Sequence, residues 1–332
     1  MNNKKRLLSI VQFAIGIGLL VVLFATMKNK TDLLDAVRDV AHRWRLLLAG
    51  TLAFGGCLAV CALRWRILLA GQDLKLAWFR SWVLYMIGHF FNSFLFGVTG
   101  GDLVKAFYAA KLTHHKKAEV ISTIILDRLV GLFALVILIV AIMACRLRFF
   151  LAHPETRVAL IFFTGLFFGG IVLCFIMFRQ DIFDRWPWLR RLKENSAVGS
   201  LISRMYGVFQ IALTEPSVMW RTLGLSILNH IMLVTSVALL GLALAVRLPF
   251  VDYLTTIPIV NAVAAIPVTP GGLGTRETAA RFLLGVLDVP ATRAVLLSLL
   301  MYASQLAWSV VGGAVYLVYS LRLGSAKAAQ EG

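Results

Sequence analysis

The chain alternates long apolar stretches with short polar ones. Six of the apolar stretches come close to the roughly 20 residues that a helix needs to cross a bilayer. They cover residues 7–27, 46–63, 120–144, 158–178, 223–246 and 294–321. Inside lipid, a helix is favoured because it satisfies its backbone hydrogen bonds internally. The pattern therefore predicts an all-α, polytopic integral membrane bundle with six full spans.

Two further apolar stretches, 82–98 and 254–268, have a different pattern. Each contains an asparagine, ends in a glycine-rich polar turn, and is followed by a short amphipathic stretch, 102–112 or 276–287. Backbone of this kind is tolerated at membrane depth where it lines a cavity or is buried in protein. We therefore expect two re-entrant or broken-helix hairpins, which bring the total to between eight and ten membrane segments.

Basic residues predict the orientation of these segments. Cytoplasmic loops carry an excess of lysine and arginine, and the basic loop 179–221 is expected to lie inside, together with both termini. The two hairpins then enter from opposite sides. The chain is expected to form one transmembrane domain, 1–332, whose first repeat motif, 82–131, and second repeat motif, 254–287, make an inverted repeat.

Composition supports the membrane assignment. Hydrophobic residues make up 60% of the chain and charged residues only 15%, and the net charge is +17. In a membrane protein, such a basic excess follows from positive cytoplasmic loops and from attraction to anionic headgroups. We therefore expect a membrane phospholipid or another anionic lipid as the partner, and no nucleic acid. The cysteines have no metal-ligand spacing, so neither a metal nor a cofactor is predicted.

The two hairpins share a polar signature, in which an asparagine precedes a glycine pair that is followed by a basic residue and a carboxylate. The signature residues are Asn92, Gly100, Gly101, Asp102 and Lys105 in the first hairpin, and Asn261, Gly271, Gly272, Gly274, Arg276 and Glu277 in the second. Glycine pairs permit tight turns, and a helix N-terminus favours an anion. The signature predicts binding of a phosphate-bearing headgroup, with Asp102 and Glu277 holding the cations or carrying protons. The alternative is that the turns only end helices.

Other polar residues also lie within the apolar stretches. Asp127 and Arg128 in the stretch 120–144 are either binding residues or a mutual ion pair, because an isolated charge is expensive there. His89, close to Asn92, is expected to act as a hydrogen-bonding strut rather than as a proton carrier.

Prolines and glycines predict where helices break and where they pack. Pro258, Pro267 and Pro270 are expected to break the second hairpin. Gly312-Gly313, together with Tyr302 and Gln305, indicates close helix packing rather than chemistry.

Residues 92–105, 127–131 and 267–277 resemble the flippase-like transmembrane region of lysylphosphatidylglycerol synthases. The resemblance implies a location in the bacterial inner membrane. It also implies binding roles for Asn92, Gly100, Gly101, Asp102, Lys105, Asp127, Arg128, Gly271, Gly272, Gly274 and Glu277. Family members often have arginine where Lys105 stands, and a proline in the stretch that here contains Phe96-Gly97. No soluble catalytic domain follows the last span in the sequence, so we expect no aminoacyl-transfer activity.

Three functions are compatible with these features. The first is a lipid translocator of the flippase or scramblase kind, which is not driven by ATP because the phosphate-binding loop motif is missing. The second is a non-catalytic lipid-binding subunit that partners a lipid-modifying enzyme. The third is an intramembrane enzyme that uses Asp102, Asp127, Glu277 and His89. Formation of a homodimer is left open.

Overall fold

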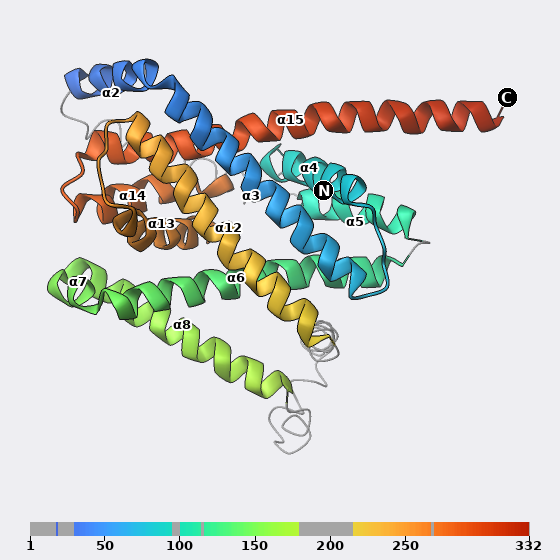
Figure 1. Cartoon of the computed structure of the whole chain (residues 1–332), viewed down its shortest axis with the longest axis horizontal. Helices are drawn as coiled ribbons and strands as arrows, with labels where there is room; N and C mark the ends of the chain where they lie inside the picture. Colours follow the sequence, from blue (N-terminus) through green and yellow to red (C-terminus); the bar gives the residue numbers. More distant parts are fainter. Residues whose placement is uncertain are drawn as a thin grey trace. The chain divides into compact units, whose positions relative to one another are not determined.

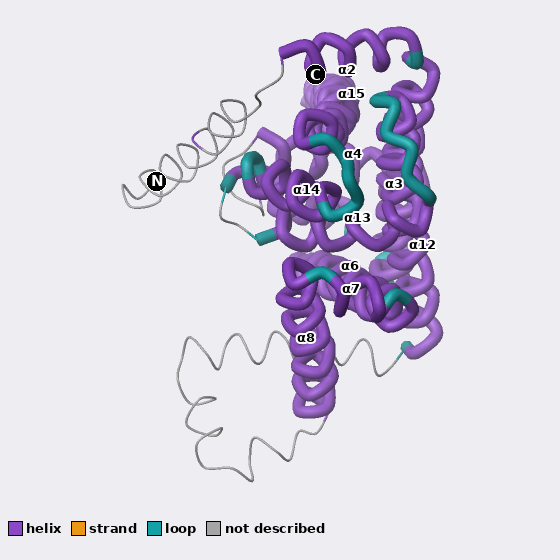
Figure 2. The backbone as a smooth tube through the Cα atoms, turned by 90° about the vertical axis from the view of Figure 1, so that its left-hand side faces the viewer, coloured by secondary structure: helices purple, strands orange, loops and turns teal. Residues whose placement is uncertain are grey.

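The computed structural model describes residues 18, 30–94, 100–113, 116–178, 215–266 and 269–331. Within these residues, every regular element is a helix, and Figure 2 shows helices joined by loops without a strand. The predicted all-α class is confirmed. The chain divides into two compact units.

Four helices in the described ranges are long and apolar enough to cross a membrane. They are α3 (Trp44–Ala70), α6 (Lys117–Cys145), α12 (Pro216–Ala243) and the part Ala291–Leu321 of α15 (Ala291–Glu331). These helices correspond to four of the six predicted spans, although α12 ends three residues before the predicted stretch 223–246 does. The chain is therefore a multi-pass helical membrane protein. Figure 1 shows α15 as the long helix that ends at the C-terminus.

The other two predicted spans are only partly visible. The stretch 158–178 lies within α8 (Pro154–Phe178), whose described apolar part, Thr156–Val172, is shorter than a full span. The stretch 7–27 falls outside the described residues except for Gly18, as does most of the basic loop 179–221. The orientation in the membrane therefore stays a prediction.

The first unit comprises Met1–Ala62, Phe79–Tyr108 and Leu228–Gly332. In it, α3 and α12 pack antiparallel, because Ser236 donates to the Gly50 carbonyl at 2.7 Å while the Cys61 thiol, further along α3, reaches the Asn229 amide oxygen. This unit also includes α2 (Lys30–His42), which precedes α3.

Glycines on α15 allow a second close approach in the same unit. A methyl group on Gly312 would overlap the Met86 carbonyl, and one on Gly313 would overlap the Phe90 ring. Both contacts lie on α4 (Trp78–Phe94). The predicted packing role of the glycine pair is confirmed.

The second unit comprises Leu63–Trp78 and Ala109–Ile227. It contains α6, the short helix α7 (Leu147–Ala152) and α8. Leu68, Leu126 and Val130 form a buried apolar cluster in which the end of α3 packs on α6.

Each predicted hairpin contains separate helices. The first contains α4 and α5 (Gly100–Leu112), with residues 95–99 between them outside the described ranges. The second contains α13 (Phe250–Ala265), the short 3-10 helix η1 (Pro270–Gly272) and α14 (Thr275–Gly285). Each broken helix is called a copy below, the first from α4 to α5 and the second from α13 to α14. Entry from opposite membrane faces stays a prediction.

One predicted helix break is wrong. Pro258 lies inside α13, where it is buried, and the helix continues past it. A proline removes only its own N–H and crowds one carbonyl, and packing against neighbouring helices offsets this cost in membrane proteins. Pro270 does begin η1 at the break, and Pro267 lies outside the described residues.

Candidate functional site

In the first copy, a side-chain amide forms a hydrogen bond between the two helices. The Asn92 side-chain oxygen on α4 accepts a hydrogen bond from the Gly101 N–H at 2.9 Å. Gly100 begins α5, and a methyl group on Gly101 would overlap the backbone of Gly88 and Asn92. Glycine is required at 101 because the backbones of α4 and α5 meet there.

A buried cation lies one turn into α5. The Lys105 ammonium lies 3.7 Å from the Asp102 carboxylate and 4.8 Å from the centroid of the Tyr85 ring. The Lys105 side chain is 5% exposed and that of Asp102 is 14% exposed. The structure therefore places Asp102 beside this cation, at a separation that exceeds hydrogen-bond length.

In the second copy, the glycines form the turn itself. Gly271, Gly272 and Gly274 have φ angles of +63°, +71° and +83°, which are conformations that L-residues rarely adopt. A methyl group on Gly272 would also lie only 2.8 Å from the Ala264 carbonyl oxygen. These glycines let the chain reverse tightly between α13 and α14.

The charges of the second copy form a closed buried network. One Glu277 carboxylate oxygen accepts from the Arg276 guanidinium at 3.0 Å and from the Ser298 hydroxyl at 3.0 Å. The other accepts from the Gly274 N–H at 2.5 Å. Arg276 donates to Ser298 at 3.1 Å and lies 5.0 Å from the centroid of the Tyr302 ring. Glu277 therefore holds the cation, as predicted, and also caps α14.

Both copies contact neighbouring turns of α15. Tyr302 lies beneath Arg276 of the second copy, and three residues further along, the Gln305 carbonyl is 3.2 Å from the His89 ring nitrogen of the first. In Figure 1, α4 and α14 both lie beside α15. The strut role of His89 is confirmed, and the structure brings the two copies together on this helix.

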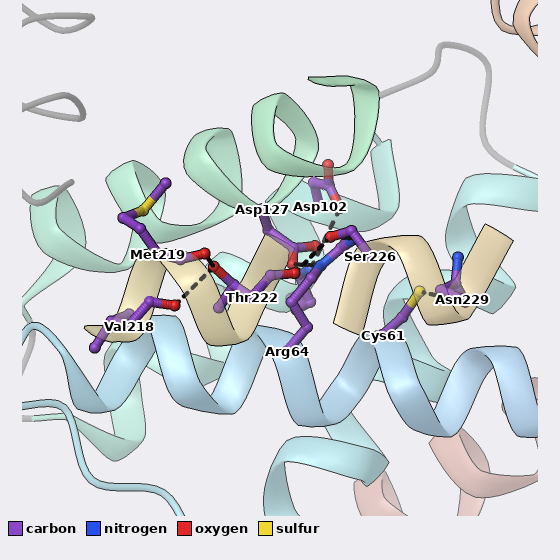
Figure 3. A network of polar contacts seen from close by, with 10 residues as sticks. Cys61, Arg64, Asp102, Asp127, Val218, Met219, Thr222, Ser226 and Asn229 are labelled. Carbon is purple, nitrogen blue, oxygen red and sulfur yellow. Dashed lines mark hydrogen bonds and ion pairs between the residues drawn. The ribbon is translucent and has the colours of Figure 1, made fainter. Parts of the chain in front are cut away.

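Asp127 and Arg128 lie in the second unit, on α6, so the structure does not place them relative to the two copies. Asp127 is buried, and its carboxylate accepts a hydrogen bond from the Arg64 Nε at 2.7 Å. Arg64 also donates to the Ser226 hydroxyl at 2.8 Å (Figure 3). Arg128 is exposed. The Asp127 carboxylate is therefore compensated by an arginine from another helix.

A glycine in the same motif makes room for this arginine. A methyl group on Gly131, one turn after Asp127, would lie 3.1 Å from the Arg64 guanidinium. Tight contact of this kind explains why a glycine follows Asp127 at this spacing.

Five residues of these sites were not predicted as such from the sequence: Tyr85, Ser298, Tyr302, Arg64 and Ser226. Arg64 had a signal, because a carboxylate within an apolar span requires a cation at similar depth. Asn261, conversely, was predicted as a site residue, but its side chain has no hydrogen-bond partner among the residues that the structure describes.

A family comparison covers most of the chain. The sequence model of the family described as "Lysylphosphatidylglycerol synthase TM region" matches residues 9–313, which include both copies and Asp127. No curated protein and no solved structure matches the chain.

Proposed function

Since the chain belongs to the lysylphosphatidylglycerol synthase TM-region family, we propose that it is a lipid translocator that carries a phosphate-bearing headgroup across the bilayer without ATP. Family membership supports the coarser part of this statement, a membrane protein linked to lipid handling. The translocation itself is our inference from the polar structure of the two copies.

One observation carries the proposal: each copy places a buried cation and a carboxylate within the first turns of a helix that follows a break in an apolar helix. Ionisable groups within apolar helices are costly, and they commonly mark a substrate path. Broken helices near the membrane midplane also commonly form transporter binding sites. Two such elements that contact neighbouring turns of α15 support one shared polar path.

The two cations differ in how they are held. Lys105 lies 3.7 Å from Asp102, so a phosphate oxygen can replace this carboxylate without breaking a short hydrogen bond. Arg276 is fixed by hydrogen bonds to Glu277 and Ser298. We therefore assign direct phosphate contact to Lys105, and to Arg276 the role of holding the second copy against α15.

Translocation by reconstituted protein tests the proposal. We would follow fluorescent phosphatidylglycerol in liposomes with the unaltered protein and with the double variant Asp102→Asn, Lys105→Gln. Replacing both members of an internal ion pair is often tolerated by the fold. The expected result is a rate reduced by about tenfold or more, equivalent to roughly 1.4 kcal/mol in the barrier.

A matched control is available on α2. Asp35 and Arg38 form an ion pair with the same three-residue spacing and the same 3.7 Å separation, but on the exposed surface. The variant Asp35→Asn, Arg38→Gln should translocate normally. An unchanged rate in the Lys105 variant would remove the assigned role, and no translocation by the unaltered protein would favour the lipid-binding subunit instead.

A further inference from the structure

A cavity of about 520 Å³ lies in the second unit, between the end of α3, the loop that follows it and the start of α12. Its lining includes three basic side chains, Arg66, Lys75 and Arg221, and two carboxylates, Asp73 and Glu215. The remaining lining residues are small or apolar. A cavity lined by both charged and apolar side chains fits an amphiphile better than a small ion.

Exposed tryptophans indicate the depth of this cavity. Trp78 follows the loop and Trp220 lies in the first turns of α12, and their side chains are 40% and 73% exposed. Exposed tryptophans concentrate where headgroups meet the hydrocarbon core. The apolar helix α3 also ends beside the cavity, at Ala70. The two tryptophans and the end of α3 are the arrangement expected of a cavity at the level of lipid headgroups.

The two carboxylates have structural explanations. Asp73 has a φ of 55°, and it closes the end of α3 together with a hydrogen bond from the Leu74 N–H to the Leu69 carbonyl. Aspartate is one of the few residues that tolerate this conformation. Glu215 directly precedes α12 and its carbonyl accepts from the Val218 N–H, so its negative charge suits a helix N-terminus.

The basic side chains are not paired directly with these carboxylates. Within the described part of the chain, no ion pair joins Arg66, Lys75 or Arg221 to Asp73 or Glu215. Arg66 uses its Nε to donate to the Leu76 carbonyl at 3.1 Å, which fixes the guanidinium at the cavity. Arg64, two residues earlier, is by contrast fully engaged with Asp127 and Ser226.

We propose that this cavity binds the phosphate of an anionic phospholipid headgroup. Three cations and two carboxylates leave the cavity with one positive charge in excess. This favours an anionic lipid over a zwitterionic lipid, whose own amine already balances its phosphate. Basic pockets between membrane helices are known to hold such headgroups. The site belongs to the second unit, is separate from both copies, and does not depend on the proposed translocation.

Lipid retention tests this site. The protein would be reconstituted in nanodiscs that contain equal amounts of phosphatidylglycerol and phosphatidylcholine, and then released for native mass spectrometry. The unaltered protein should retain phosphatidylglycerol preferentially. The variant Arg66→Gln, Arg221→Gln should bind it about thirtyfold more weakly, because each basic residue near a membrane surface contributes a factor of roughly five. The variant Lys75→Gln, Arg221→Gln tests the same charge loss without touching the Arg66 contact.

The matched control removes two exposed arginines elsewhere in the second unit, Arg148→Gln and Arg157→Gln. Arg157 also donates to a backbone carbonyl, that of Leu151, but it does not line the cavity. Equal loss in the control, preferential retention of phosphatidylcholine, or no preference in the unaltered protein would each overturn the proposal. Calorimetry with inorganic phosphate, in nanodiscs of phosphatidylcholine alone, distinguishes the source. If binding of inorganic phosphate depends on Arg221 while retention of phosphatidylglycerol does not, the ligand of this site is a soluble phosphate instead of a lipid.

Discussion

The two copies begin from the same sequence signature and form different polar structures. In the first, Asn92 bridges α4 and α5, while Lys105 and Asp102 stay 3.7 Å apart. In the second, Arg276 and Glu277 are joined at 3.0 Å, and Ser298 completes their network. The Lys105–Asp102 pair is longer than a hydrogen bond, whereas the Arg276–Glu277 pair is hydrogen-bonded.

The order of the charged residues explains this difference. In the first copy, the base follows the acid by three positions, so the two meet across one turn of α5. In the second, the base directly precedes the acid. The Glu277 carboxylate accepts from the Gly274 N–H at the start of α14, and the neighbouring Arg276 donates to the same carboxylate. The planar guanidinium also makes directional hydrogen bonds, whereas the lysine ammonium acts as a point charge. Two segments with the same sequence signature can thus hold their cations in different ways.

The largest effect is expected from breaking the hydrogen-bonded network of the second copy. The substitution Glu277→Ala leaves Arg276 buried without its carboxylate and should destabilise the protein by roughly 3–5 kcal/mol. The corresponding substitution Asp102→Ala should cost clearly less, because its pair is longer and its side chain is partly exposed. Thermal unfolding of the purified variants in detergent measures the difference. Equal losses would contradict this difference between the two pairs.

A smaller effect should separate the glycines of the two copies. Gly101 is required for close backbone approach, so Gly101→Asn should cost about 3 kcal/mol through overpacking. Gly271 is needed for its positive φ, and the nearest contact of an added methyl is the Tyr302 ring at 3.5 Å. Because asparagine tolerates this conformation, Gly271→Asn should cost less than about 1 kcal/mol. Melting temperatures of the two variants check this ranking. A greater loss of stability for Gly271→Asn than for Gly101→Asn would contradict it.

The smallest effect concerns the paired asparagines. Asn92→Ala removes the acceptor for the Gly101 N–H and should cost about 1 kcal/mol, as loss of a helix cap does. The Asn261 side chain bonds no described residue, so Asn261→Ala should change stability by less than about half of that. The same unfolding measurement compares them, and equivalent losses would indicate that Asn261 has a structural role.

The sequence was sufficient to predict that each hairpin contains separate helices, and it placed each base close to an acid. Paired glycines beside charged residues interrupt an apolar pattern wherever they occur, so this signal is local. Contacts from distant parts of the chain were not predictable in the same way. Ser298 and Tyr302 lie in a span whose pattern indicates only packing, and their role depends on where α14 meets α15.

Pro258 and Arg64 show two further limits of the sequence pattern. Proline predicts a break, but α13 continues through Pro258 because tertiary packing outweighs the local preference. Arg64 follows directly after the predicted span 46–63, where it looks like an interfacial residue. The helix in fact continues to Ala70, which places Arg64 within it and opposite Asp127.

Direct contact between Lys105 and a lipid phosphate is the central claim. Solid-state NMR of protein with ¹⁵N-labelled lysine side chains in phosphatidylglycerol bilayers can detect dipolar coupling from an ammonium nitrogen to lipid ³¹P. Subtracting the spectrum of the folded Asp102→Asn, Lys105→Gln variant isolates the contribution of Lys105. A coupled signal that disappears in the variant is the predicted result, whereas identical spectra would show that Lys105 does not contact the headgroup.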